Sequence, residues 1–249
     1  MGFELLYLGH SAFQLRTAAG TVVLIDPFIS ENRLCPLRIE ELPPPHAVLV
    51  THGAFDHLGD AFAIVARTGA RLICAPEVRR AAIAKGIAEE RVDLIVWGGA
   101  IQRCGLVIRA VENRHISHLL LEGSFLTGMP LSFILEVEPG LSIYHAGDTS
   151  LFSDLHLIGE LYRPAVALVP VGAAPGFFPE LLPREAARAV SWLRPDVAVP
   201  MHYQEKVDAQ LFLTCVELLV PGTRAILLNP GEVLYFDRSV TAEIRPTRG

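Results

Sequence analysis

The feature that most constrains the fold is a series of ten short apolar runs, which are rich in β-branched residues and bounded by Gly, Pro or Asp. Short runs of this kind are typical of buried strands, whereas amphipathic helices are longer and repeat their apolar residues every three or four positions. We therefore predict strands at residues 21–26, 47–52, 71–76, 92–97, 106–111, 131–137, 141–147, 166–172, 197–202 and 225–236. Residues 131–147 and 225–236 are each predicted to contain a hairpin-like pair.

Helical patterns lie between several of these runs. Pro183 stands near the first turn of one of them and Pro195 follows its end, while Gly86 is expected to end another. The predicted helices span residues 61–69, 76–86, 183–195 and 207–219. Strands that alternate with helices, with hairpins mixed in, indicate an α/β or α+β sandwich with mixed sheets. Because no low-complexity segment or linker interrupts the chain, we expect residues 1–249 to form a single domain.

The composition narrows the class of protein. With 51% hydrophobic and 19% charged residues, the chain is not disordered, collagen-like or coiled-coil. Its net charge of −6 and the lack of a stripe of Lys and Arg argue against nucleic-acid binding. Its four cysteines lie far apart, so neither a thiolate zinc site nor a disulfide framework is expected. Since the sequence shows no signal peptide and no apolar run of about 18 residues, we expect a cytoplasmic protein without a membrane partner.

Histidine and aspartate collect directly after the apolar runs. The residues in question are Asp26, His52, Asp56, His57, His115, Asp148 and His202. Taken singly, each is more often a turn or core residue, but ligands bind at the carboxyl ends of strands in α/β folds, where distant residues converge. Five strand ends that carry only imidazole and carboxylate groups indicate a metal site for Zn, Mn or Fe, of the kind that supports hydrolysis.

Five ordered motifs give the chain a family resemblance. They are LGHSAF at residues 8–13, LIDPF at 24–28, THGAFDHLGD at 51–60, HAGDTSLF at 145–152 and PMHY at 200–203. Together these motifs resemble the metallo-β-lactamase superfamily, in particular its small metal-dependent hydrolases related to the ascorbate-6-phosphate lactonases. The resemblance runs from residue 5 to about residue 235. It implies a four-layer αββα sandwich, with two mixed β-sheets face to face, helices outside and a metal centre along one edge.

The resemblance also implies two sets of metal ligands that share one bridging carboxylate. The complete set comprises Asp56, His57, His202 and the bridging Asp148. The other set comprises His52, His115 and the middle histidine of the family's H-x-H-x-D-H motif, which is Ala54 in this chain and is followed by Phe55 in place of a small residue. Because an alanine methyl group cannot donate a lone pair, we expect one tight site for Zn or Mn and at most a weak second site.

Three further residues have open roles. His118 lies three residues after His115, and either imidazole could turn inward from a loop, although the register favours His115. Asp26 is expected to accept a hydrogen bond from a ligand imidazole without binding metal itself, and a turn aspartate before Pro27 is the alternative. His10 is expected to line the pocket, and a hydrogen-bonded core histidine is the alternative.

The implied function is hydrolysis of a small-molecule ester, lactone or phosphoester by a metal-activated water, with Asp56 as the catalytic residue that orients this water. The Gly- and Pro-rich segment 171–183 is a candidate for one apolar wall of the pocket, and a plain connecting loop is the alternative. Because Ala54 removes a donor, the alternative is a catalytically impaired metal-binding domain that acts as a sensor or a partner-binding module. A nucleic-acid-processing member would carry a basic track or an added domain, and neither is visible. The sequence leaves a homo-oligomer open.

Overall fold

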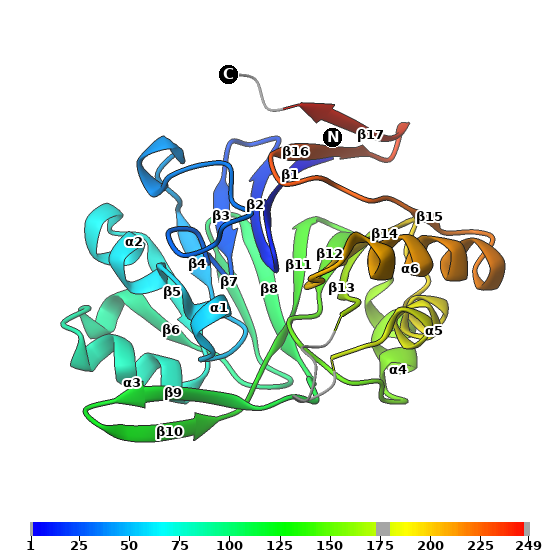
Figure 1. Cartoon of the computed structure of the whole chain (residues 1–249). Coiled ribbons are helices and arrows are strands. Elements are labelled where there is room, and N and C mark those ends of the chain that lie inside the picture. Colours follow the sequence, from blue (N-terminus) through cyan, green and yellow to red (C-terminus); the bar gives the residue numbers. More distant parts are fainter. Residues whose placement is uncertain (1, 173–179, 247–249) are drawn as a thin grey trace. The chain divides into compact units, whose positions relative to one another are not determined.

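The structure is a computed structural model that describes residues 2–172 and 180–246 (Figure 1). The chain divides into two compact units. Unit 1 comprises Met1–Val96, Ile116–Pro130 and Leu228–Gly249, and unit 2 comprises Trp97–His115 and Leu131–Leu227. Each unit is built from one large mixed sheet and its own helices. The expectation of a single domain stays a prediction.

The large sheet of unit 1 has eight strands in the order β17-β16-β1-β2-β3-β4-β5-β6. Neighbouring strands are antiparallel from β17 to β3 and parallel from β3 to β6. The strands are β1 Gly2–Gly9, β2 Ala12–Thr17, β3 Val22–Ile25, β4 Ala47–Leu49, β5 Arg71–Cys74, β6 Val92–Leu94, β16 Glu232–Asp237 and β17 Val240–Pro246. Because β1 and β3 are both antiparallel to β2, they run in the same direction. The carboxyl ends of β1, β3 and β4 therefore meet at one edge of this sheet.

Helices and a small hairpin complete unit 1. They are α1 Phe55–Leu58, α2 Ala61–Thr68, α3 Pro76–Ala84, the 3₁₀ turns Ile39–Glu41 and Glu89–Arg91, and the hairpin of β9 Ser117–Leu121 with β10 Ser124–Gly128. Helix α2 ends where Gly69 takes a left-handed φ of 76°, and α3 begins with proline at its first position. The buried faces of both helices pack on strand side chains such as Val48 and Leu72, which forms the core of this unit.

The large sheet of unit 2 has seven strands in the order β15-β14-β13-β12-β11-β8-β7. Neighbouring strands are antiparallel from β7 to β12 and parallel from β12 to β15. The strands are β7 Ala100–Arg103, β8 Leu106–Val111, β11 Ser132–Glu138, β12 Leu141–His145, β13 Val166–Pro170, β14 Val197–Met201 and β15 Arg224–Ala225. Because β8 and β12 are both antiparallel to β11, the carboxyl ends of β8, β12 and β14 also meet at one edge.

Three helices belong to unit 2: α4 Leu155–Tyr162, α5 Pro183–Leu193 and α6 Lys206–Leu219. Figure 1 shows them side by side, with α5 between α4 and α6. A side chain at Gly159 would place its Cβ 2.2 Å from the carbonyl oxygen of Trp192, so glycine is what allows α4 and α5 to approach this closely. None of the helices in the described ranges is long and apolar enough to cross a membrane.

The predicted α/β fold with two mixed sheets is confirmed, and every predicted strand and helix segment contains an element of the predicted type. The hairpin predicted within residues 131–147 is confirmed as β11 with β12. The hairpin predicted within residues 225–236 is wrong, because β15 pairs with β14 in unit 2 whereas β16 pairs with β1 in unit 1. The amide of Gly231, which lies between these two strands, donates to the carbonyl of Tyr7 over 2.7 Å, so the connection after β15 already contacts β1.

Candidate metal centre

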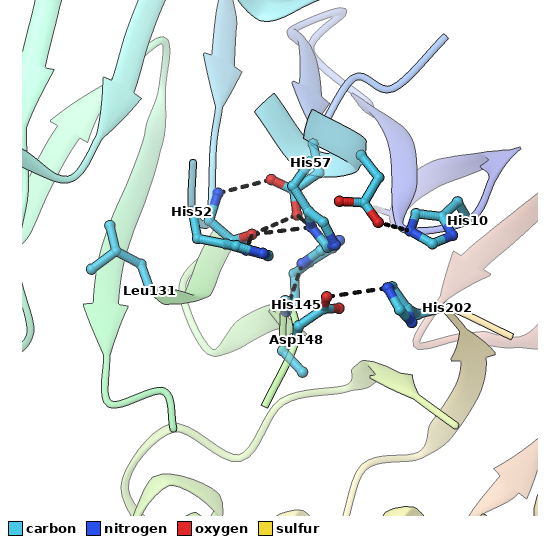
Figure 2. A network of polar contacts seen from close by, with 12 residues as sticks. His10, His52, His57, Leu131, His145, Asp148 and His202 are labelled. Atoms are coloured by element: carbon cyan, nitrogen blue, oxygen red, sulfur yellow. Dashed lines mark hydrogen bonds and ion pairs between the residues drawn. The ribbon is translucent and has the colours of Figure 1, made fainter. Parts of the chain in front are cut away.

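Asp26 is the centre of a buried hydrogen-bond network at the edge of unit 1. It follows β3 directly, and its side chain is fully buried. One carboxylate oxygen accepts a hydrogen bond from the backbone amide of Thr51 (2.8 Å), and the other accepts one from the Thr51 hydroxyl (2.7 Å). The Nδ1 atom of His57 lies 2.7 Å from the same second oxygen and donates to it (Figure 2). This is the contact with a candidate ligand that was predicted for Asp26.

The same network determines which nitrogen of His52 and His57 carries the proton. The single hydroxyl proton of Thr51 goes to Asp26, so the Thr51 oxygen accepts at its remaining contacts. His52 Nδ1 lies 3.0 Å from that oxygen and donates to it. Both imidazoles therefore hold their proton on Nδ1 and present the lone pair of Nε2, which is the atom that can bind a metal. Their ring centroids lie 4.1 Å apart.

The short helix α1 presents Asp56 and His57 next to His10. Helix α1 ends at Gly59, whose φ is 42° and where a Cβ would lie 2.6 Å from the carbonyl oxygen of Pro27. His10 follows β1, and its Nε2 lies 3.1 Å from a carboxylate oxygen of Asp56 (Figure 2). His10, Asp56 and His57 offer ligand atoms that all lie within 4.8 Å of one another. His10 thus stands beside two of the candidate ligands, and its role in a pocket stays a prediction.

In unit 2 the structure brings together the three remaining predicted ligands, His115, Asp148 and His202. They follow the carboxyl ends of β8, β12 and β14. His202 Nε2 lies 3.1 Å from a carboxylate oxygen of Asp148 (Figure 2). His115 Nε2 lies 4.0 Å from the same oxygen. His118, the alternative to His115, instead lies on β9 in unit 1, with its ring 6.2 Å from that of Phe125. The 4.0 Å contact with Asp148 is the observation that favours His115.

The contact between His202 and Asp148 brings together two groups that can both bind a cation. The Nδ1 atom of His202 donates to the backbone carbonyl of Gly172 over 3.1 Å, so in the neutral imidazole Nε2 carries the lone pair. That lone pair faces a carboxylate oxygen at 3.1 Å. Two electron-rich atoms repel at this distance unless a proton or a cation lies between them. The donor types and their burial therefore fit a divalent cation.

Backbone contacts hold His115 in place beside Asp148. The amide of Arg114 donates to the hydroxyl of Thr149 over 3.0 Å, and the amide of Ser150 donates back to the carbonyl of Arg114 over 3.0 Å. Below them, the buried side-chain amide of Asn113 donates to the carbonyl of Ala146 over 2.8 Å. The loops after β8 and β12 are therefore joined to each other by bonds that precede His115 and flank Asp148 in the sequence.

Ala54 and Phe55 occupy the positions where the motif departs from the family pattern. Ala54 precedes α1 in an extended conformation and supplies no donor atom. The Phe55 side chain is 73% exposed, and its ring meets that of Phe28 edge to face with centroids 5.9 Å apart. Phe55 therefore points outward to solvent and does not fill an interior volume beside residue 54.

Three residues of the candidate metal centre have a left-handed backbone conformation. Among the described residues, seven non-glycine residues have a positive φ, and three of them are His10 (58°), Asp26 (46°) and His202 (52°). A left-handed conformation is unfavourable for such residues, and strain of this kind is typical of functional sites whose surroundings hold a side chain in one direction.

Several residues near the candidate ligands were not predicted. Thr51 fixes two imidazole tautomers, and its place directly before His52 in the motif was the signal for it. The hydroxyl of Ser117 accepts from the amide of Gly53 over 2.9 Å and donates to the buried carboxylate of Glu77, which supports the motif loop. Glu180 lies beside His115 and Asp148, and no motif marks it. Of the expected pocket wall at 171–183, residues 173–179 lie outside the described residues.

Comparison with known proteins places the chain in a family. Residues 21–203 match the family model of the beta-lactamase superfamily domain. A UPF0173 metal-dependent hydrolase of Methanopyrus kandleri is 42% identical over 234 residues, which cover 92% of this chain and 98% of that protein. Another, of Methanosarcina mazei, is 39% identical over 92% of this chain and 96% of that protein.

A solved structure agrees with this placement. It is that of Igni18, described as a novel metallo hydrolase of the archaeon Ignicoccus hospitalis, which is 31% identical to this chain with a TM-score of 0.81. The match covers 95% of this chain and 99% of that protein. The chain therefore belongs to the metallo-β-lactamase superfamily, within the UPF0173 family of metal-dependent hydrolases.

Proposed function

We propose that the chain hydrolyses a small-molecule ester, lactone or phosphoester and that Zn or Mn is its cation. The proposed ligands are His52, Asp56, His57, His115, Asp148 and His202. The observation that carries the proposal is the shared orientation of three buried imidazoles: His52, His57 and His202 each direct Nδ1 to an oxygen within 3.1 Å. Each therefore presents Nε2 as a donor, which is how metal-binding histidines are held in proteins.

The chemistry follows from these donors and from one accessible carboxylate. A bound divalent cation supplies Lewis acidity, which lowers the pKa of a coordinated water and polarises a carbonyl or phosphoryl oxygen. Asp56 is the proposed catalytic residue, because its side chain is 21% exposed whereas His52 and His57 are fully buried. A carboxylate that solvent can reach is able to accept a hydrogen bond from the attacking water and orient it. His10, 3.1 Å away, fixes the position of one Asp56 oxygen.

The test combines metal analysis with an activity screen. Protein purified without chelator should contain about one equivalent of metal, and it should hydrolyse at least one member of a panel of p-nitrophenyl esters, lactones and phosphodiesters. His202→Ala should lose most of the metal and the activity, because it removes a ligand at the carboxyl end of β14. Cys104→Ser is the matched control in the same unit and should retain both.

Two outcomes would contradict the proposal in different ways. Hydrolysis that survives complete removal of metal by a chelator would contradict the metal mechanism. Metal binding without hydrolysis of any substrate class would instead favour the sensor or partner-binding module, the alternative that the missing donor at Ala54 suggests.

A further inference from the structure

A buried carboxylate outside the predicted ligand set lies close to two of its members. His115, Asp148 and Glu180, all in unit 2, offer ligand atoms that lie within 4.8 Å of one another. Glu180 is 7% exposed and Asp148 is 3% exposed, so both carboxylates are removed from water. Two buried carboxylates at this separation repel each other, and a shared proton or a cation between them relieves the repulsion.

The chain segment around Glu180 holds this carboxylate in place. Leu181, which follows it, is 1% exposed and anchors the segment in the core. The amide of Leu182 donates to the side chain of Glu185 over 3.1 Å, which fixes the start of α5. Glu180 therefore stands directly before a buried leucine and two residues before Leu182, the N-cap residue of α5.

The number of metal-binding side chains in the predicted ligand set indicates a role for this carboxylate. Ala54 supplies no ligand where the family motif has a histidine, so the chain is one imidazole short. Resting on the proposed function, we infer that Glu180 is a metal ligand that acts with His115 and Asp148, so that an added carboxylate offsets the missing imidazole. Two carboxylates and one imidazole form a harder donor set than one rich in imidazole. Carboxylate oxygen suits Mn²⁺, whereas imidazole suits Zn²⁺, so Glu180 shifts the metal preference toward Mn²⁺.

The experiment measures metal affinity directly. Dissociation constants for Mn²⁺ and Zn²⁺ are determined by competition titration of metal-free protein, and bound Mn²⁺ is followed by electron paramagnetic resonance. Glu180→Gln keeps the size of the side chain but removes its charge, so Mn²⁺ should bind at least tenfold more weakly, with a smaller change for Zn²⁺. Glu180→His should shift the preference toward Zn²⁺. Glu160→Gln, on the exposed face of α4 in the same unit, is the matched control and should bind both metals as the parent does.

The outcomes separate this inference from the function on which it rests. If Glu180→Gln binds Mn²⁺ as tightly as the parent while His202→Ala loses metal, Glu180 is not a ligand and the proposed metal centre still stands. If His202→Ala and Asp148→Asn also retain metal, the proposed function itself fails. If Glu180→Gln melts far below the parent, the affinity of Glu180→Asp for both metals is measured as well. A folded aspartate variant with unchanged affinity for both metals, alongside a destabilised glutamine variant, would assign Glu180 a structural role and overturn the inference.

Discussion

Asp26 binds no metal in the proposed site, yet it sets the protonation of two imidazoles that do. Its carboxylate accepts hydrogen bonds from Thr51 and His57. It is linked to His52 through the Thr51 hydroxyl, which accepts a hydrogen bond from His52. Asp26→Asn would turn an NH₂ group toward partners that also donate, so the Nδ1 proton of His57 would lose its acceptor. We expect metal affinity to fall about 10- to 100-fold, as for other residues that orient metal-binding histidines. A competition titration measures this, and Asp196→Asn, at an exposed position, should leave the affinity unchanged.

Ala54 offers a gain-of-function test at the same scale. If this residue occupies the vacant ligand position, Ala54→His should raise the affinity for a second metal by about tenfold, equivalent to about 1.4 kcal/mol. Phe55 can stay, because its ring is 73% exposed and does not compete for interior volume. Ala63→His, at an exposed position of α2, controls for adding a histidine to the surface. An unchanged second affinity in the Ala54 variant would remove residue 54 from the site.

The residues that could be predicted are those that a motif and a strand end mark together, such as Asp26, Asp148 and His202. The sequence could not show that Glu180 lies near His115, because these residues are far apart in the chain and only the packing of loops brings their side chains together. The sequence could not predict the tautomers of His52 and His57 either, since these depend on the direction of the Thr51 hydroxyl.

At the scale of elements, the turn at Gly59 that ends α1 determines how Asp56 and His57 are positioned. Gly59 has a positive φ, and a Cβ at this position would lie within 2.9 Å of backbone atoms of Pro27 and Phe28. Gly59→Ala should therefore destabilise the protein by about 2 to 5 kcal/mol, from conformational strain and from the clash. Gly86→Ala isolates the strain, because its φ is 86° and nothing lies within 4 Å, and it should cost about 1 to 2 kcal/mol. Urea denaturation measures both, and equal losses would contradict the role of the close contact.

The elements that the sequence predicted are those whose apolar residues are contiguous, because parallel strands such as β13 and β14 are buried throughout. Strand β2 escaped prediction because Gln14 interrupts its apolar pattern, although this side chain is buried. Helix α4 was not predicted for a related reason. Gly159 lowers its helix propensity, yet the contact with α5 requires glycine there. In each case tertiary packing outweighs the local signal.

At the scale of the whole molecule, the path of the chain through the two units is relevant to the prediction that residues 1–249 form a single domain. Unit 1 is assembled from three separate segments and unit 2 from two, so neither is a continuous piece of chain. We expect both to unfold in one cooperative transition.

Two natural probes can test this. The two tryptophans, Trp97 and Trp192, lie in unit 2, while Cys74 is buried in β5 of unit 1, where burial raises the pKa of its thiol and suppresses its reactivity. In a variant with Cys35, Cys104 and Cys215 changed to serine, tryptophan fluorescence and Cys74 alkylation should give the same urea midpoint. Two distinct midpoints would mean that the units are separate domains.

The position of β1 between β2 and β16 has a consequence for biosynthesis. Strand β1 leaves the ribosome long before its partner β16, which begins only at Glu232. At roughly 5 to 20 residues per second, translation leaves one edge of this apolar strand uncovered for on the order of ten to forty seconds. An unpaired apolar edge is a template for association with other chains. The nascent protein therefore has a long interval in which a chaperone that shields extended apolar segments would raise its yield.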